Sequence, residues 1–174
     1  MRPARGLTPL LVAVVVGVLL AGCGSSSPTP SPTPTPLPLQ LLRQRYLAAA
    51  NAYISAEQPI AQAENMYCVL AAPTADLVKC TMALSSDRQT TIIFDTAVRA
   101  IEFPPSSRSD VSKLLNDDAQ LEILLQQASV APSLSAVNAL TPQIFQLLAT
   151  SSNDAGTVRK DIGLPLPSTS PPAA

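Results

Sequence analysis

The sequence of 174 residues contains no histidine and no tryptophan, and only six of its residues are glycine. Without histidine, the chain cannot form a Ser-His-Asp or Cys-His catalytic arrangement, and it lacks the His ligands of di-iron helical bundles. The few glycines form no Gly-rich loop of the kind that binds phosphate. The 11 lysines and arginines form no basic cluster, so nucleic acid is not an expected partner. We therefore expect a protein that is not an enzyme and that has no cofactor.

Cysteine is also scarce, with three residues in the chain. Cys68 and Cys80 lie six residues before and after Thr74, where a turn is expected. In two antiparallel helices, both would lie about 9 Å from the turn, because a helix rises ~1.5 Å per residue. Helix axes ~8–10 Å apart bring facing Cα atoms within reach of a disulfide. We predict a Cys68–Cys80 disulfide; two buried free thiols are the alternative. A tight zinc site is excluded by the lack of histidine and by the two available thiols.

The N-terminal segment combines a positive charge with a short apolar run. Arg2 and Arg5 precede the apolar residues 7–20, and the sequence Leu-Ala-Gly-Cys follows at 20–23. Since about 20 apolar residues are needed to cross a bilayer, this shorter run is typical of a cleavable signal peptide. The four residues ending in Cys23 resemble the lipobox of bacterial lipoprotein precursors.

This resemblance implies removal of residues 1–22 and a diacylglyceryl thioether on Cys23, whose two acyl chains make the anchoring durable where a single chain would bind only marginally. The protein is then expected on the extracytoplasmic face of the cell membrane, bound by its lipid. Plain secretory cleavage close to an unmodified cysteine is the alternative.

Composition divides the rest of the chain into three parts. Residues 23–38 are rich in Ser, Thr and Pro, with proline at every second position from Pro28 to Pro38. This pattern predicts an extended tether. Residues 39–164 are long enough for one domain with a core, and residues 165–174 are predicted to be a disordered tail. The whole resembles the small helical lipoproteins of the bacterial envelope that carry a Thr/Pro-rich spacer.

Apolar residues between 39 and 164 recur at three- and four-residue intervals, the period of an amphipathic α-helix. Four such stretches span about 42–70, 77–101, 111–128 and 134–162, and short segments containing proline separate them. No stretch has the two-residue alternation of a strand. The sequence therefore predicts an all-α protein, an up-down-up-down four-helix bundle with kinked long helices and one disulfide.

Single residues predict the local details of these helices. Pro59 should bend the first helix, because it removes one backbone hydrogen bond, and Pro142 should start or kink the fourth. Thr74 is the expected N-cap of the second helix. Ser107 and Asp110 have the spacing of a capping box at the start of the third.

Two aspartates interrupt the apolar stripes, Asp87 in the second stretch and Asp118 in the third. A buried carboxylate is unfavourable unless it is paired, so an interior position would indicate a site or an ion pair with Arg88 or Arg99. We expect instead that a small rotation of each helix places both aspartates in solvent at the rim. The acidic cluster of Asp117, Asp118 and Glu122 lacks the loop spacing of a Ca²⁺ site and is interpreted as a solvated helix face.

Three tyrosines share the first stripe: Tyr46, Tyr53 and Tyr67. Such a stripe is more typical of a core in which each hydroxyl finds a backbone or water partner. The alternative is that the tyrosines line a ligand groove, in which their hydroxyls orient the ligand.

Two functions are compatible with these observations. The first is a non-enzymatic lipoprotein module that binds an envelope protein or captures a small ligand between its helices. The second is a hydrolase or transferase of cell-envelope polymer that uses a carboxylate pair, with Asp87 and Asp118 facing one cleft.

Overall fold

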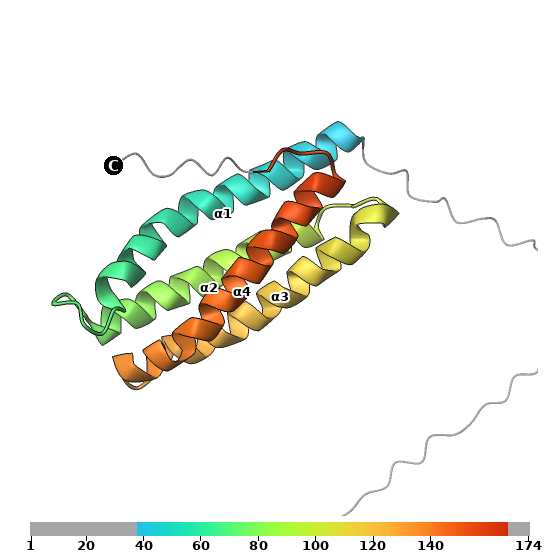
Figure 1. Cartoon of the computed structure of the whole chain (residues 1–174). Helices are drawn as coiled ribbons and strands as arrows, with labels where there is room; N and C mark the ends of the chain where they lie inside the picture. Colours follow the sequence, from blue (N-terminus) through green and yellow to red (C-terminus); the bar gives the residue numbers. More distant parts are fainter. Residues whose placement is uncertain (1–37, 167–174) are drawn as a thin grey trace, which may run out of the picture. The chain divides into compact units, whose positions relative to one another are not determined.

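The computed structural model describes residues 38–166, and within this range it contains helices and no strand. The elements are α1 (Leu39–Tyr67), α2 (Leu77–Arg99), the 3-10 turn η1 (Pro105–Ser107), α3 (Arg108–Ser129) and α4 (Leu134–Asp161) (Figure 1). The all-α prediction and the four helical stretches are confirmed. The predicted signal peptide, Cys23, most of the tether and most of the tail lie outside the described residues.

Each helix packs antiparallel against its neighbour in the sequence, giving the predicted up-down-up-down bundle (Figure 1). Close packing joins α1 to α2, α2 to α3, and α3 to α4. Two apolar clusters fill the interior. One lies towards the end where α1 begins and contains Leu42, Tyr46, Phe94, Val98, Leu114 and Val158; the other lies towards the disulfide and contains Leu84, Leu121, Leu125, Val137 and Ile144.

Pro59 and Pro142 both lie inside helices, as the apolar stripes that continue past them indicated. Pro59 lies within α1, which curves visibly along its length in Figure 1. Pro142 lies within α4 and does not start it, because Ser133 is the N-cap and its side chain accepts a hydrogen bond from the Ala136 amide at 3.1 Å.

Two of the predicted caps are wrong. Asp76, not Thr74, caps α2: its carboxylate accepts a hydrogen bond from the Lys79 amide at 3.1 Å, while the Thr74 hydroxyl donates to the Met66 carbonyl oxygen at 2.6 Å. Ser107 precedes α3 but makes no side-chain cap bond. Its backbone is already helical (φ −100°, ψ −7°) because η1 leads directly into α3, whereas an N-cap needs extended geometry.

The Cys68–Cys80 disulfide is confirmed, with an S–S distance of 2.10 Å and a Cα–Cα distance of 4.9 Å. It joins the residue that follows α1 to the first turn of α2, so it closes the first helical hairpin at its turn.

Candidate functional site

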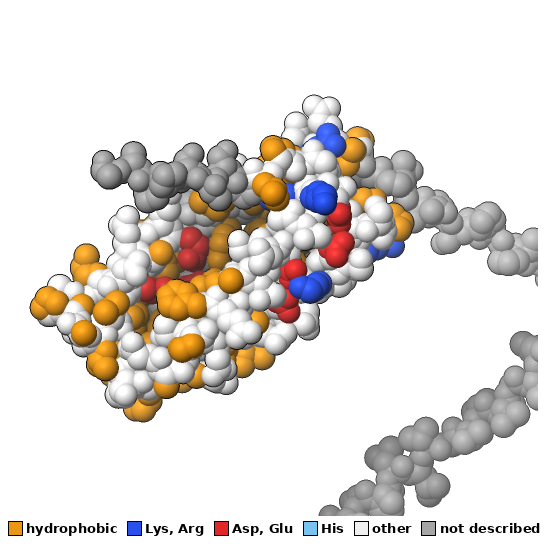
Figure 2. Space-filling view, in the orientation of Figure 1, with side chains coloured by type: hydrophobic (Ala, Val, Ile, Leu, Met, Phe, Trp, Pro, Cys, Tyr) orange, Lys and Arg blue, Asp and Glu red, His pale blue; other side chains and the backbone are white. Residues whose placement is uncertain are grey.

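A cleft of about 250 Å³ lies between α1 and α4, the first and last helices, which are not closely packed against each other. Figure 2 shows hydrophobic and acidic side chains recessed between these helices. All four helices contribute to its lining, which includes Tyr46, Ala50, Tyr53, Phe94, Asp118, Leu148, Ser151 and Arg159. The walls are therefore mostly apolar, with a few polar groups, which is the usual composition of a small-molecule site.

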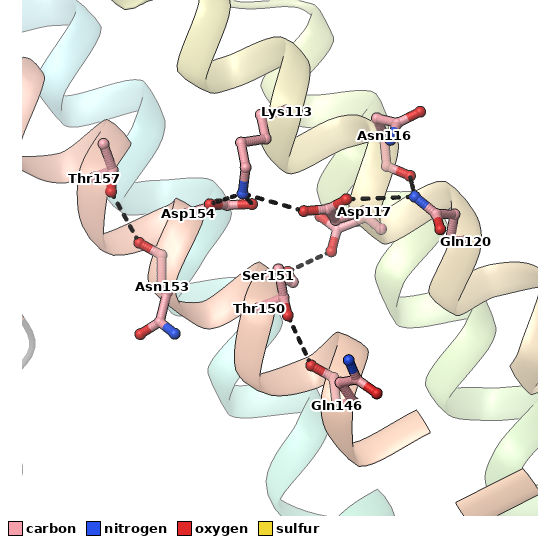
Figure 3. Close-up of polar contacts among 11 residues, drawn as sticks. Lys113, Asn116, Asp117, Gln120, Gln146, Thr150, Ser151, Asn153, Asp154 and Thr157 are labelled. Atoms are coloured by element: carbon pink, nitrogen blue, oxygen red, sulfur yellow. Dashed lines mark hydrogen bonds and ion pairs between the residues drawn. The ribbon is translucent and has the colours of Figure 1, made fainter. Parts of the chain in front are cut away.

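Asp118 is the buried acid of this cleft, with a relative exposure of 2%. The Ser151 hydroxyl, from α4, donates a short hydrogen bond to its Oδ1, drawn as the dashed line from Ser151 in Figure 3. No hydrogen-bond donor in the described residues reaches its Oδ2. Burial raises the pKa of Asp118, because a carboxylate loses its hydration inside the protein.

Asp95 of α2 lies close enough to Asp118 for each carboxyl group to shift the pKa of the other, so the two form a pair between neighbouring helices. Asp95 is fully buried, and Arg99 lies at its outer side with Nη2 2.9 Å from Asp95 Oδ2. Burial is the largest cause that raises the pKa of Asp95, followed by the Asp118 charge; Arg99 acts in the opposite direction. Like charges this close cannot both ionise without a large penalty, so the pair favours holding one proton.

A second group of acids connects α1 with α2. Asp87 is 2% exposed and lies near Glu57, and burial is the largest cause that raises the pKa of both carboxyl groups. Glu64, one heptad after Glu57, has its pKa raised to about 7 by burial and then by the Asp87 charge. Each of the three carboxyl groups has one oxygen that no donor in the described residues reaches.

The predicted solvent exposure of Asp87 and Asp118 is thus wrong, since both lie in the interior. Arg88 and Arg99 were the candidate partners, but Arg99 pairs with Asp95 instead. The rotation of α2 and α3 directs both aspartates inward, Asp118 towards Asp95 and Asp87 towards Glu57.

Two of the three tyrosines belong to the cleft. Tyr46 is 1% exposed, its hydroxyl donates to the Ala155 carbonyl oxygen at 3.2 Å, and burial raises its pKa to about 12. Tyr53 lies against Phe94 with 5.3 Å between ring centroids, and burial raises its pKa strongly. Tyr67 does not line the cleft: its ring lies 4.8 Å from the Lys79 ammonium, beside a shallow groove between α1 and α2.

An ion network joins α3 to α4, between the exposed Lys113 and the mostly buried Asp117 and Asp154 (Figure 3). Lys113 Nζ lies 2.5 and 2.7 Å from the two carboxylate oxygens of Asp154 and 3.4 Å from Asp117. Asp117 therefore faces Lys113 while its neighbour Asp118 faces inward. Within residues 38–166, no group of three Cys, Asp or Glu side chains is arranged to hold a metal ion.

Sequence reasoning missed Glu57, Glu64 and Asp95, although a signal for each was present. Thr91 and Asp95 follow Asp87 at four-residue steps, so the three share one helix face. Glu57 and Glu64 are separated by seven residues, which also places them on one face. An acidic residue on the same helix face as an aspartate that interrupts the apolar stripe was therefore a candidate for burial beside it.

Comparison of the chain with protein-family models, with curated proteins and with solved structures finds no significant match. None of the helices described is both long and apolar enough to cross a membrane.

Proposed function

We propose that this protein is a membrane-anchored extracytoplasmic lipoprotein, with a helical body that is a non-enzymatic module for capturing a small ligand between α1 and α4. The anchor is a lipid on Cys23, which lies outside the described residues. Support for it comes from the apolar run at 7–20 and the sequence Leu-Ala-Gly-Cys at 20–23. The Cys68–Cys80 disulfide supports an oxidising compartment, where such bonds persist.

The cleft is the observation that carries the ligand-binding role. It is lined mostly by apolar side chains, it reaches a buried polar group, and it lies between the first and last helices, which are not closely packed against each other. A volume of about 250 Å³ is slightly below the range for drug-sized ligands, roughly 300–1,000 Å³, and favours a small occupant.

The anchor is tested by expressing the full chain and its Cys23→Ser variant in a bacterial host that processes lipoproteins. Wild type should enter the detergent phase after membrane extraction, and its intact mass should show residues 1–22 absent and acyl chains present. The variant should lose the acyl mass and leave the membrane fraction. A wild-type chain with an unmodified thiol would overturn the anchor.

The binding role is tested by blocking the cleft. Ala50→Phe places a ring in the cleft, whereas Ala48→Phe places the same ring on the exposed side of the same helix. A small-molecule panel is screened by thermal shift on wild type, and hits are measured on both variants. Binding should be lost in Ala50→Phe and kept in Ala48→Phe. Hits that bind all three proteins equally would contradict the assignment.

The alternative, a hydrolase or transferase acting on envelope polymer, is favoured by one observation: Asp87 and Asp118 are both buried, with raised pKa values. Against it, Asp118 lines the cleft but Asp87 does not, so the two acids do not flank one opening. Release of soluble fragments from purified cell wall by wild type, and its loss in Asp118→Asn, would establish the enzyme.

A further inference from the structure

The interior between the helices contains more acid than base. Five carboxyl groups there each have one buried oxygen that no donor in the described residues reaches: Glu57, Glu64, Asp87, Asp95 and Asp118. Among the ion pairs of residues 38–166, only the one between Arg99 and Asp95 involves any of these groups, and the Arg99 side chain is 53% exposed. Buried carboxylates without a donor are strongly unfavourable. A molecule that supplies positive charge and N–H donors would remove this penalty.

Asp118 is the member of this set that lines the cleft. Its carboxylate is held in place by the Ser151 hydroxyl, so one oxygen is oriented and occupied while the other still needs a donor. A carboxylate fixed in this way, 2% exposed and at the side of an apolar cleft, is suited to an ammonium group.

The walls around Asp118 define the rest of the ligand. Tyr53 and Phe94 present aromatic rings, and Leu148 and Ala50 complete an apolar surface. Aromatic faces attract cations as well as apolar groups. The matching ligand therefore has an apolar or aromatic body as well as a charged head.

Arg159 limits the number of positive charges that a ligand in the cleft can carry. It also lines the cleft, eight residues after Ser151 on α4, which is about 12 Å along the helix. Its guanidinium donates to the Pro165 carbonyl oxygen at 2.9 Å and so stays near that end of the cleft. A second positive charge on the ligand at this end would be repelled.

We propose that the cleft between α1 and α4 binds a small organic monocation, with its ammonium group on Asp118 and its apolar body between Tyr53 and Leu148. This proposal rests on the binding role proposed above and adds the chemical class of the ligand.

Three probes of matched shape and different charge test it: 2-phenylethylamine, 2-phenylethanol and phenylacetate, titrated by calorimetry into the disulfide-bonded protein at neutral pH. The amine should bind about tenfold more tightly than the alcohol, since a hydrogen bond to a charged group is worth about that factor, and phenylacetate should bind least. Asp118→Asn should abolish the preference for the amine and keep binding of the alcohol. The matched control, Asp117→Asn, removes the same charge next to the exposed Lys113 and should keep the preference.

Each other outcome is decisive. Equal binding of the amine and the alcohol would overturn the proposed preference for a cation and leave the binding role of the cleft in place. Loss of the preference in both variants would assign it to general negative charge and not to Asp118. If none of the three probes binds, the proposed cationic ligand is overturned. The thermal-shift screen of the small-molecule panel described above tests the binding role separately. Circular dichroism on each variant confirms that it is folded.

Discussion

Glu64 provides the sharpest test of the acidic interior. Its carboxyl group is partly buried on α1, has one oxygen without a donor in the described residues, and has its pKa raised from 4.5 to about 7, first by burial and then by the Asp87 charge. We expect Glu64→Gln to stabilise the protein above pH 7, because the amide has the shape of the protonated acid and no charge to desolvate.

The sign of the pH dependence follows from the direction of the shift. Between pH 4.5 and about 7, the folded state holds a proton on Glu64 that the unfolded state has released. The free energy of unfolding therefore falls as pH rises through this window, by up to about 1.4 kcal/mol per pH unit, and is constant on either side. The full effect is at most about 3.5 kcal/mol, and solvent access to the partly buried group reduces it. Asp95, Asp87 and Glu57 act in the same direction, since their pKa values are also raised.

The assay is urea unfolding followed by circular dichroism at 222 nm, at unit steps from pH 4 to 8. Wild type should lose stability as pH rises, and Glu64→Gln should lose less, with the two curves meeting near pH 4. Glu102→Gln makes the same charge change at an exposed position between α2 and η1 and should follow wild type. If wild type gained stability between pH 5 and 7, or if both variants behaved alike, the burial of Glu64 would be refuted.

Two further predictions concern stability. Replacing Cys68 and Cys80 together by serine should lower the free energy of unfolding by about 3 kcal/mol, the chain-entropy value for a loop of this length; an unfolding midpoint that a reductant leaves unchanged would contradict this. Tyr46→Phe should lower the free energy of unfolding by about 1 kcal/mol, because the Ala155 carbonyl oxygen loses its hydroxyl donor. Tyr67→Phe should lower it less, because the Tyr67 hydroxyl makes no hydrogen bond within residues 38–166. Equal losses in urea unfolding would show that the Tyr46 hydrogen bond contributes nothing.

The architecture was predictable because it depends on a repeated signal. Each helix carries many apolar residues at helical spacing, so a proline such as Pro59 does not obscure the pattern. The disulfide followed from counting residues on either side of the turn, which does not require knowing how the helices rotate.

The interior acids were not predictable in the same way, because they depend on that rotation. A turn of a few tens of degrees about the axis of α2 moves Asp87 between the rim and the core, and a stripe that mixes Asp and Thr with apolar residues does not determine it. The caps failed for a related reason: Thr74 and Asp76 are both good capping residues, and only the length of the turn decides between them.

The order in which the helices pack also bears on how the chain reaches its native state. Every closely packed helix pair is consecutive in the sequence, so each hairpin can form without the distant ends of the domain meeting. Little loop-closure entropy opposes such short-range assembly, and bundles of this kind typically refold within microseconds to milliseconds. Because α1 and α4 are not closely packed, changes along that edge should speed or slow refolding very little.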